Sequence, residues 1–276
     1  MTTKTPAPPV AQLNYETLLV RAEGDLLWVT LNLPDQANAL SPQMIADLTA
    51  IYSAPLRSQG VRGLLLDAAG RHFSAGADLK HLASLLDAGE NQNRADSALL
   101  RELFEAVLRQ PCLTVALVQG ACVAGGCGLA TAHDYVVASD EARFLYSEVR
   151  IGFVAALVAT FLSLRVRGTD LRELLLFPEF IAARRAREIG LVNRVCPRDE
   201  LAETGHRLAS RILENGSSES IARTKELLLQ VIGLDLEAAL DKAAEANAKA
   251  RGTDDCKRGI TTFLASKSTP NWREPE

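Results

Sequence analysis

Two glycine-containing turns and one glutamate have the residue types and order that chemistry at a carbonyl group requires. The turns are residues 73–78 (FSAGAD) and 124–126 (AGG), and each follows an apolar run. This pattern is typical of a strand, a tight turn and a helix start, where a backbone amide can approach a ligand closely. The amides of Ala77 and Gly125 could together hold one oxygen atom that gains negative charge.

Glu148 is the carboxylate that could act on the same compound. It lies in residues 144–149 (FLYSEV), an otherwise mostly apolar stretch downstream of the second turn. A carboxylate in an apolar pocket has its charged form disfavoured, so its pKa rises towards the working pH. Two amide donors and one such carboxylate together suggest chemistry next to a carbonyl.

The sequence resembles the crotonase, or enoyl-CoA hydratase/isomerase, superfamily over roughly residues 15–267. Five matching segments follow the order of the superfamily: 38–40 (NAL), 73–78, 120–130 (GACVAGGCGLA), 147–152 (SEVRIG) and 186–197 (AREIGLVNRVCP). The resemblance implies an α/β fold, a crotonase-like spiral of ββα units with a C-terminal all-helical oligomerisation region. It also implies an acyl-CoA substrate, with coenzyme A as part of the substrate and no other cofactor, and a homotrimer or dimer of trimers.

The resemblance assigns roles to individual residues. The amides of Ala77 and Gly125 would stabilise the thioester oxygen as an enolate forms, and Glu148, at the second catalytic carboxylate of the family, would shuttle the proton. The implied substrate-binding residues are Ala37, Asn38, Ala39, Ala75, Gly76, Lys80, Gly126, Gly128, Phe263 and Lys267, of which the last two would reach the nucleotide bound by a neighbouring subunit.

Gly128 departs from the family's two-carboxylate hydratases, which have a glutamate at this position. Hydration needs one group to activate water and another to protonate the neighbouring carbon, and glycine does neither. Moving a double bond from C3 to C2 needs a single base, so the sequence favours a Δ3,Δ2-enoyl-CoA isomerase. Some hydratase relatives that act on branched glutaconyl-type thioesters also lack the first carboxylate, so hydration stays an alternative.

Three further alternatives have less support. Dienoyl-CoA isomerases carry acids at the positions of Gly128 and Ala156. Decarboxylase relatives use a lysine or histidine near the first turn, where Lys80 and His81 stand, but lysine is ordinary there in the family. A CoA-binding or scaffold protein that has lost turnover is the alternative from a different functional class.

Composition narrows the functional class. The 276 residues carry a net charge of −4, so no general basic field favours nucleic acid or an anionic membrane. The five cysteines are odd in number and irregularly spaced, which favours buried thiols in a reducing compartment. No apolar run has the length of a membrane span, and we expect a cytoplasmic protein. His72 and His206 lack neighbours at metal-ligand spacing, so no metal site is expected.

We divide the chain into a disordered arm (1–12), an α/β core (13–197) and a helical C-terminal region (198–276). The core begins with a hairpin of strands at 18–22 and 26–33, followed by a helix that starts at Ser41 and Pro42 and runs to about residue 56. Residues 87–96 are polar and predict a mobile excursion before a helix at 99–108. After residue 197, the predicted helices are 199–213, 218–231, 236–249 and 255–266.

Overall fold

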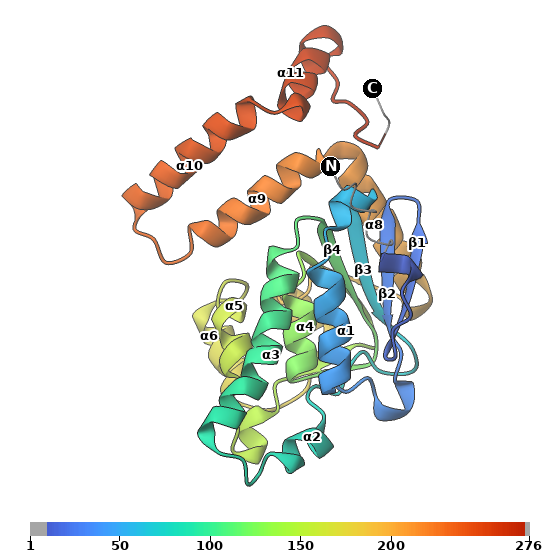
Figure 1. Ribbon diagram of the computed structural model, residues 1–276, viewed down its shortest axis with the longest axis vertical. Coiled ribbons are helices and arrows are strands. Elements are labelled where there is room, and N and C mark those ends of the chain that lie inside the picture. Colours follow the sequence, from blue (N-terminus) through green and yellow to red (C-terminus); the bar gives the residue numbers. More distant parts are fainter. Residues whose placement is uncertain (1–9, 274–276) are drawn as a thin grey trace, which may run out of the picture.

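The computed structural model describes residues 10–273, and a six-stranded sheet forms its centre (Figure 1). The strand order is β1 (Leu18–Glu23), β2 (Leu26–Leu31), β3 (Gly63–Ala68), β4 (Leu113–Val118), β6 (Tyr135–Ser139) and β9 (Arg194–Cys196). Strands β1 and β2 form an antiparallel hairpin, and every later neighbour pairs in parallel. All of β4 is buried, as expected for a parallel strand covered on both faces.

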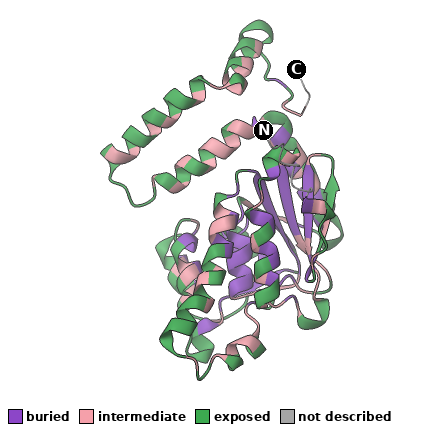
Figure 2. Cartoon of the chain, in the orientation of Figure 1, coloured by how far each residue is buried: buried purple, intermediate pink, exposed green. Residues whose placement is uncertain are grey.

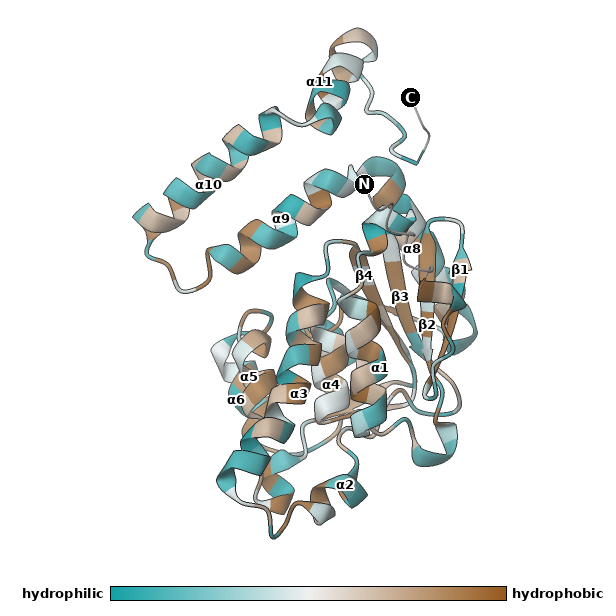
Figure 3. Ribbon diagram, in the orientation of Figure 1, coloured by the Kyte–Doolittle hydropathy of each residue, from teal (hydrophilic) through white to brown (hydrophobic). Residues whose placement is uncertain are grey.

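Helices cover both faces of this sheet. One face carries the larger part of the core, with α1 (Pro42–Tyr52), α3 (Glu90–Arg109) and α4 (Gly125–Thr131) (Figures 1 and 2). The other face is covered by α8 (Leu201–Asn215), whose Leu213 belongs to a cluster with Trp28 and Leu117. Figure 3 shows β3 and β4 as strongly hydrophobic ribbons between these layers.

A second, three-stranded sheet lies beside the first. Strand β5 (Ala121–Val123) pairs in parallel with β7 (Arg143–Leu145), which pairs antiparallel with β8 (Ile181–Ala182). The remaining helices of the core are α2 (Leu79–Ser84), α5 (Ala156–Leu162), α6 (Gly168–Leu176) and α7 (Ala183–Glu188). Short 3-10 helices are η1 (Val10–Gln12), η2 (Pro34–Gln36), η3 (Leu56–Gln59), η4 (Glu148–Ile151) and η5 (Arg198–Glu200).

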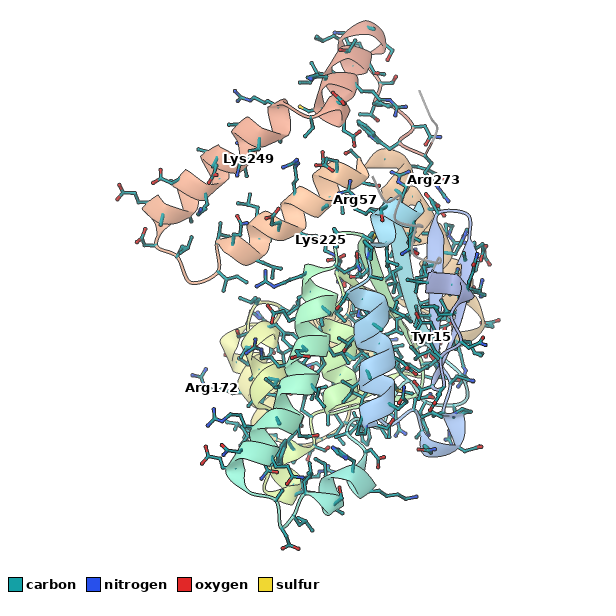
Figure 4. The ribbon with its side chains drawn as sticks, in the orientation of Figure 1. Tyr15, Arg57, Arg172, Lys225, Lys249 and Arg273 are labelled. Carbon is teal, nitrogen blue, oxygen red and sulfur yellow. The ribbon has the colours of Figure 1, made fainter. Side chains whose placement is uncertain are left out.

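The last three helices extend away from the core (Figure 1): α9 (Ser218–Gln230), α10 (Leu236–Arg251) and α11 (Asp254–Ser266). Helix α9 is tied to the core by the ion pairs Lys225–Asp134 at 2.6 Å and Arg57–Glu219 at 2.7 Å (Figure 4). Helices α10 and α11 contain no buried residue (Figure 2). No helix within residues 10–273 combines the length and apolar character needed to cross a membrane.

Several predictions about the elements are confirmed. The hairpin and the C-terminal helices form close to the expected bounds, and the hydroxyl of Ser41 accepts a hydrogen bond from the amide of Met44 as an N-cap does. The helix that it caps ends at Tyr52, before the predicted residue 56, because Pro55 follows soon after.

Two predictions about the elements need correction. Residues 90–96 are not a loop but the first turns of α3, because a polar segment can form a solvated helix, here with an Arg94–Glu90 ion pair. The region after residue 197 is helical as predicted, but its first long helix, α8, packs on the central sheet, and the helices that extend away from the core begin at Ser218. The predicted arm lies mostly outside the described residues, but its residues 10–12 form η1, and Val10 is buried.

Candidate active site

The second sheet places Gly125 and Glu148 at the same edge. Val123 of β5 pairs in register with Leu145 of the parallel strand β7. The amide of Ala124 also donates to the carbonyl of Leu145 at 2.7 Å. Because parallel strands run in one direction, the residues that follow Val123 and Leu145 leave the sheet side by side. Gly125 begins α4 there, and Glu148 begins η4.

The first glycine turn lies along the other side of β5. The amide of Val123 donates to the carbonyl of Ser74 at 2.9 Å, and the amide of Leu40 donates to the carbonyl of Gly76 at 2.7 Å. This pairing brings Ala77 next to Gly125: a Cβ built on Gly125 would lie 3.9 Å from the nitrogen of Ala77. The two amides named from the sequence are therefore neighbours in space.

Neither of these amides is used within the described chain. Among residues 10–273, no acceptor is found for the backbone N–H of Ala77 or of Gly125. Ala124, directly before Gly125, has a φ of +48°, a conformation that residues with a Cβ rarely adopt. A strained turn followed by a free amide is the arrangement expected of an oxyanion hole.

Glu148 is buried without a partner for one of its oxygens. The residue is 8 % exposed, and its Oε2 has no hydrogen-bond partner. Burial raises the pKa of Glu148, an effect that a backbone hydrogen bond partly opposes. Its own carbonyl accepts from the amide of Phe153 at 2.9 Å, which fixes the short helix that carries it. A buried carboxyl with a raised pKa and a free oxygen suits proton transfer.

Gly128 faces hydrocarbon. A Cβ built on it would lie 2.7 Å from Cγ2 of Val158 and 2.8 Å from Cζ of Phe104, and both of these side chains are buried. The space that an acidic side chain would need is thus filled from α5 and α3. Sequence reasoning did not find Phe104 or Val158, because apolar periodicity marks them only as core residues.

The loop of residues 37–39 lies beside the first turn, since the amide of Ala75 donates to the carbonyl of Ala37 at 2.8 Å. The side chain of Asn38 is fully buried and donates to the carbonyls of Ala69 and His72 at 3.0 and 3.1 Å. Its amide group therefore holds the loop in place, and a ligand could contact residue 38 only through the backbone.

The other predicted binding residues fall into two groups. Gly126 packs against Ser74, where a Cβ would lie 2.7 Å from the serine Cβ, and Lys80 is exposed on α2. Phe263 lies on α11 and Lys267 directly follows it, and Figure 1 shows α11 at the opposite end of the molecule from α2. The chain itself does not bring these two residues to the site.

Comparison with known proteins gives a consistent result. The model of the family described as "Enoyl-CoA hydratase/isomerase" matches residues 21–275. A protein of Thermus thermophilus named putative enoyl-CoA hydratase is 42 % identical, over 89 % of this chain and 96 % of that protein. The trans-2-decenoyl-[acyl-carrier-protein] isomerase of Streptococcus mutans is 26 % identical, over 92 % and 97 %. A crystal structure of an enoyl-CoA hydratase from Mycobacterium smegmatis is 30 % identical with a TM-score of 0.86, covering 94 % of this chain and 99 % of that one.

Proposed function

Because the chain belongs to the enoyl-CoA hydratase/isomerase family, we propose that this enzyme moves the double bond of a 3-enoyl-CoA to position 2. The observation that carries the proposal is the hydrocarbon at Gly128. Phe104 and Val158 fill the space beside the α-carbon of Gly128, where two-carboxylate hydratases have an additional glutamate. The proposed site therefore has one buried carboxylate, that of Glu148. One base is enough for isomerisation.

The proposed reaction consists of two proton transfers. Glu148, as carboxylate, takes a proton from C2 of the 3-enoyl thioester, and the electron pair is delocalised onto the thioester oxygen. The amides of Ala77 and Gly125 donate to that oxygen, more strongly as its charge grows. Glu148 then returns the proton to C4, which leaves the double bond between C2 and C3. Its raised pKa suits both halves of this cycle.

The substrate-binding residues extend from this centre. The turn at residues 75–77 would contact the pantetheine arm, and the backbone of residues 37–39 the adenine side. Lys80, exposed on α2, would lie near the mouth of the site. Coenzyme A enters as part of the substrate, and the reaction as written needs no further cofactor.

We also propose that the protein assembles as a homotrimer or a dimer of trimers. Figure 3 shows hydrophobic segments on the helices that extend away from the core. Their exposed apolar side chains include Leu228, Leu236, Leu240, Ile260, Phe263 and Leu264. Contact with another copy would bury these side chains and bring Phe263 and Lys267 to a neighbouring site. Light scattering on the purified protein measures the mass directly, and a monomer at micromolar concentration contradicts the assembly.

All five cysteines are free thiols, in line with the proposed cytoplasmic location.

Hydration is the second candidate, because the Thermus thermophilus relative is named putative enoyl-CoA hydratase. Glu148 would then have to activate water and supply the proton by itself.

Two substrates separate the candidates: 3-hexenoyl-CoA reports isomerisation, and crotonyl-CoA reports hydration. We expect the wild type to convert 3-hexenoyl-CoA faster, and Glu148→Gln to lower its kcat by about 10²- to 10⁴-fold. Conversion of crotonyl-CoA alone would favour hydration. No turnover of either substrate, with CoA binding unchanged in Glu148→Gln, would favour a non-catalytic CoA-binding protein.

A further inference from the structure

Phe104 and Val158 form a wall that faces Gly128. A surface cavity of about 170 Å³ lies behind this wall. Residues from α3, α5 and α9 surround it, and its apolar lining consists of Phe104, Leu108, Leu157, Phe161 and Leu229. Phe104 belongs to both the wall and the cavity lining, because the tip of its ring lies against Gly128 and the same side chain lines the cavity.

We expect the acyl chain of the proposed substrate to run towards this wall. Its thioester oxygen would lie at the amide of Gly125, at the start of α4. Gly128 stands three residues further along the same helix, and residues three apart lie on one side of a helix. An acyl chain that ran from there along α4 would meet Phe104 and Val158 beyond C4.

We propose that Phe104 sets the upper limit of acyl-chain length, as the partition between the catalytic centre and this cavity. The inference rests on the proposed acyl-CoA substrate but not on which reaction follows. Removing the ring would open the wall at Gly128 and let a longer hydrocarbon chain pass between α3 and α5 into the cavity.

The lining of the cavity matches a hydrocarbon occupant. Its charged members, Arg101, Glu105 and Arg109, pair with one another: Glu105 lies 2.8 Å from Arg109 and 3.6 Å from Arg101. The remaining surface is mainly apolar side chains. Phe161 packs edge-on against Phe104 with ring centroids 5.4 Å apart, so aromatic contact holds the partition in place.

The test measures binding of saturated hexanoyl-, octanoyl- and dodecanoyl-CoA by calorimetry, in a Glu148→Gln background; these compounds have no double bond and are not turned over. Each methylene that leaves water contributes about 0.8 kcal/mol, or about fourfold in affinity. Phe104→Ala should therefore raise the affinity for dodecanoyl-CoA relative to hexanoyl-CoA by at least about tenfold over the parent.

Leu108→Ala is the matched control, because Leu108 lines the cavity without forming the wall at Gly128. The ratio of its affinity for dodecanoyl-CoA to its affinity for hexanoyl-CoA should stay within about twofold of the parent's ratio, which is less than the effect of one methylene group. Phe104→Leu, a smaller change, should give an intermediate ratio and replaces the alanine variant if that variant does not fold.

An unchanged ratio in both Phe104 variants would overturn the inference, and so would an equal gain in Leu108→Ala. The outcome is separable from that of the proposed function. A protein that shows the expected binding series but does not isomerise 3-hexenoyl-CoA contradicts the reaction and leaves the role of Phe104 intact.

Discussion

Gly76 and Gly125 come from two different turns and meet so closely that a Cβ on Gly76 would lie 3.3 Å from the nitrogen of Gly125. The same Cβ would lie 2.7 Å from the carbonyl oxygen of Val123, and Gly76 has a φ of +85°. A side chain at residue 76 is thus excluded both by conformation and by contact. This close approach sets the spacing of the two free amides.

Gly76→Ala should therefore damage the site. The added methyl group pushes the first turn away from β5 and separates the amide of Ala77 from that of Gly125. Loss of one oxyanion donor typically lowers kcat by about 10²- to 10³-fold. Gly89→Ser is the control, since a Cβ at Gly89 contacts nothing within 4 Å. Steady-state kinetics on 3-hexenoyl-CoA check this, and equal activity of the two variants would contradict it.

Gly128→Glu alone should not create a second catalytic acid. The new Cβ would clash with Phe104 and Val158, and overpacking of a core typically destabilises a protein by about 1–3 kcal/mol. Combining Gly128→Glu with Phe104→Ala makes room, and the double variant should hydrate crotonyl-CoA faster than Phe104→Ala does. Denaturant unfolding measures the first effect and loss of crotonyl-CoA absorbance the second. If Gly128→Glu alone were stable and hydrated crotonyl-CoA, Phe104 and Val158 would have moved to make room, and the prediction would be wrong.

The raised pKa of Glu148 makes burial of this carboxyl unfavourable once it ionises. Between its usual value of 4.5 and its raised folded value, the folded state binds more protons than the unfolded state, so stability falls as pH rises through this window. Glu148→Gln removes the titration. The variant should gain stability relative to wild type across the window and keep that gain at higher pH. Urea unfolding at several pH values measures the difference, and a constant difference refutes the assignment.

Titration of His133 should make stability depend on pH in the opposite direction. His133 is fully buried, its Nε2 lies 2.6 Å from the hydroxyl of Tyr52, and burial lowers its pKa from 6.5 to about 3. The unfolded state therefore binds more protons between these values, and stability is lost as pH falls from 6.5 towards 3. The contribution approaches about 1.4 kcal/mol per pH unit within this window. His133→Gln should show a shallower acid decline in urea unfolding; parallel curves would contradict this.

Tyr52→Phe tests the same contact at neutral pH. It leaves the ring nitrogen of His133 without its partner in a dry interior, so unfolding free energy should fall by about 1–3 kcal/mol. Tyr135→Phe, on a half-exposed tyrosine, is a control that should change stability by less than about 0.5 kcal/mol. Similar losses in the two variants would show that the buried pair contributes little.

The sequence by itself determined the local elements and the family. The apolar run of β4 and the N-cap at Ser41 are local signals, because side-chain period and capping chemistry act over a few residues. The same holds for the two glycine turns that present Ala77 and Gly125. Local sequence signals did not predict that α8 packs on the central sheet or that α3 begins at Glu90.

Only the tertiary structure decided what surrounds the site. Phe104 and Val158 stand far from Gly128 in sequence, on different helices, yet they fill the space beside its α-carbon. The unpaired Oε2 of Glu148 likewise depends on which groups the fold leaves near it. Periodicity records which face of an element is apolar, whereas the identity of the neighbour across a packed interior follows from how distant helices dock.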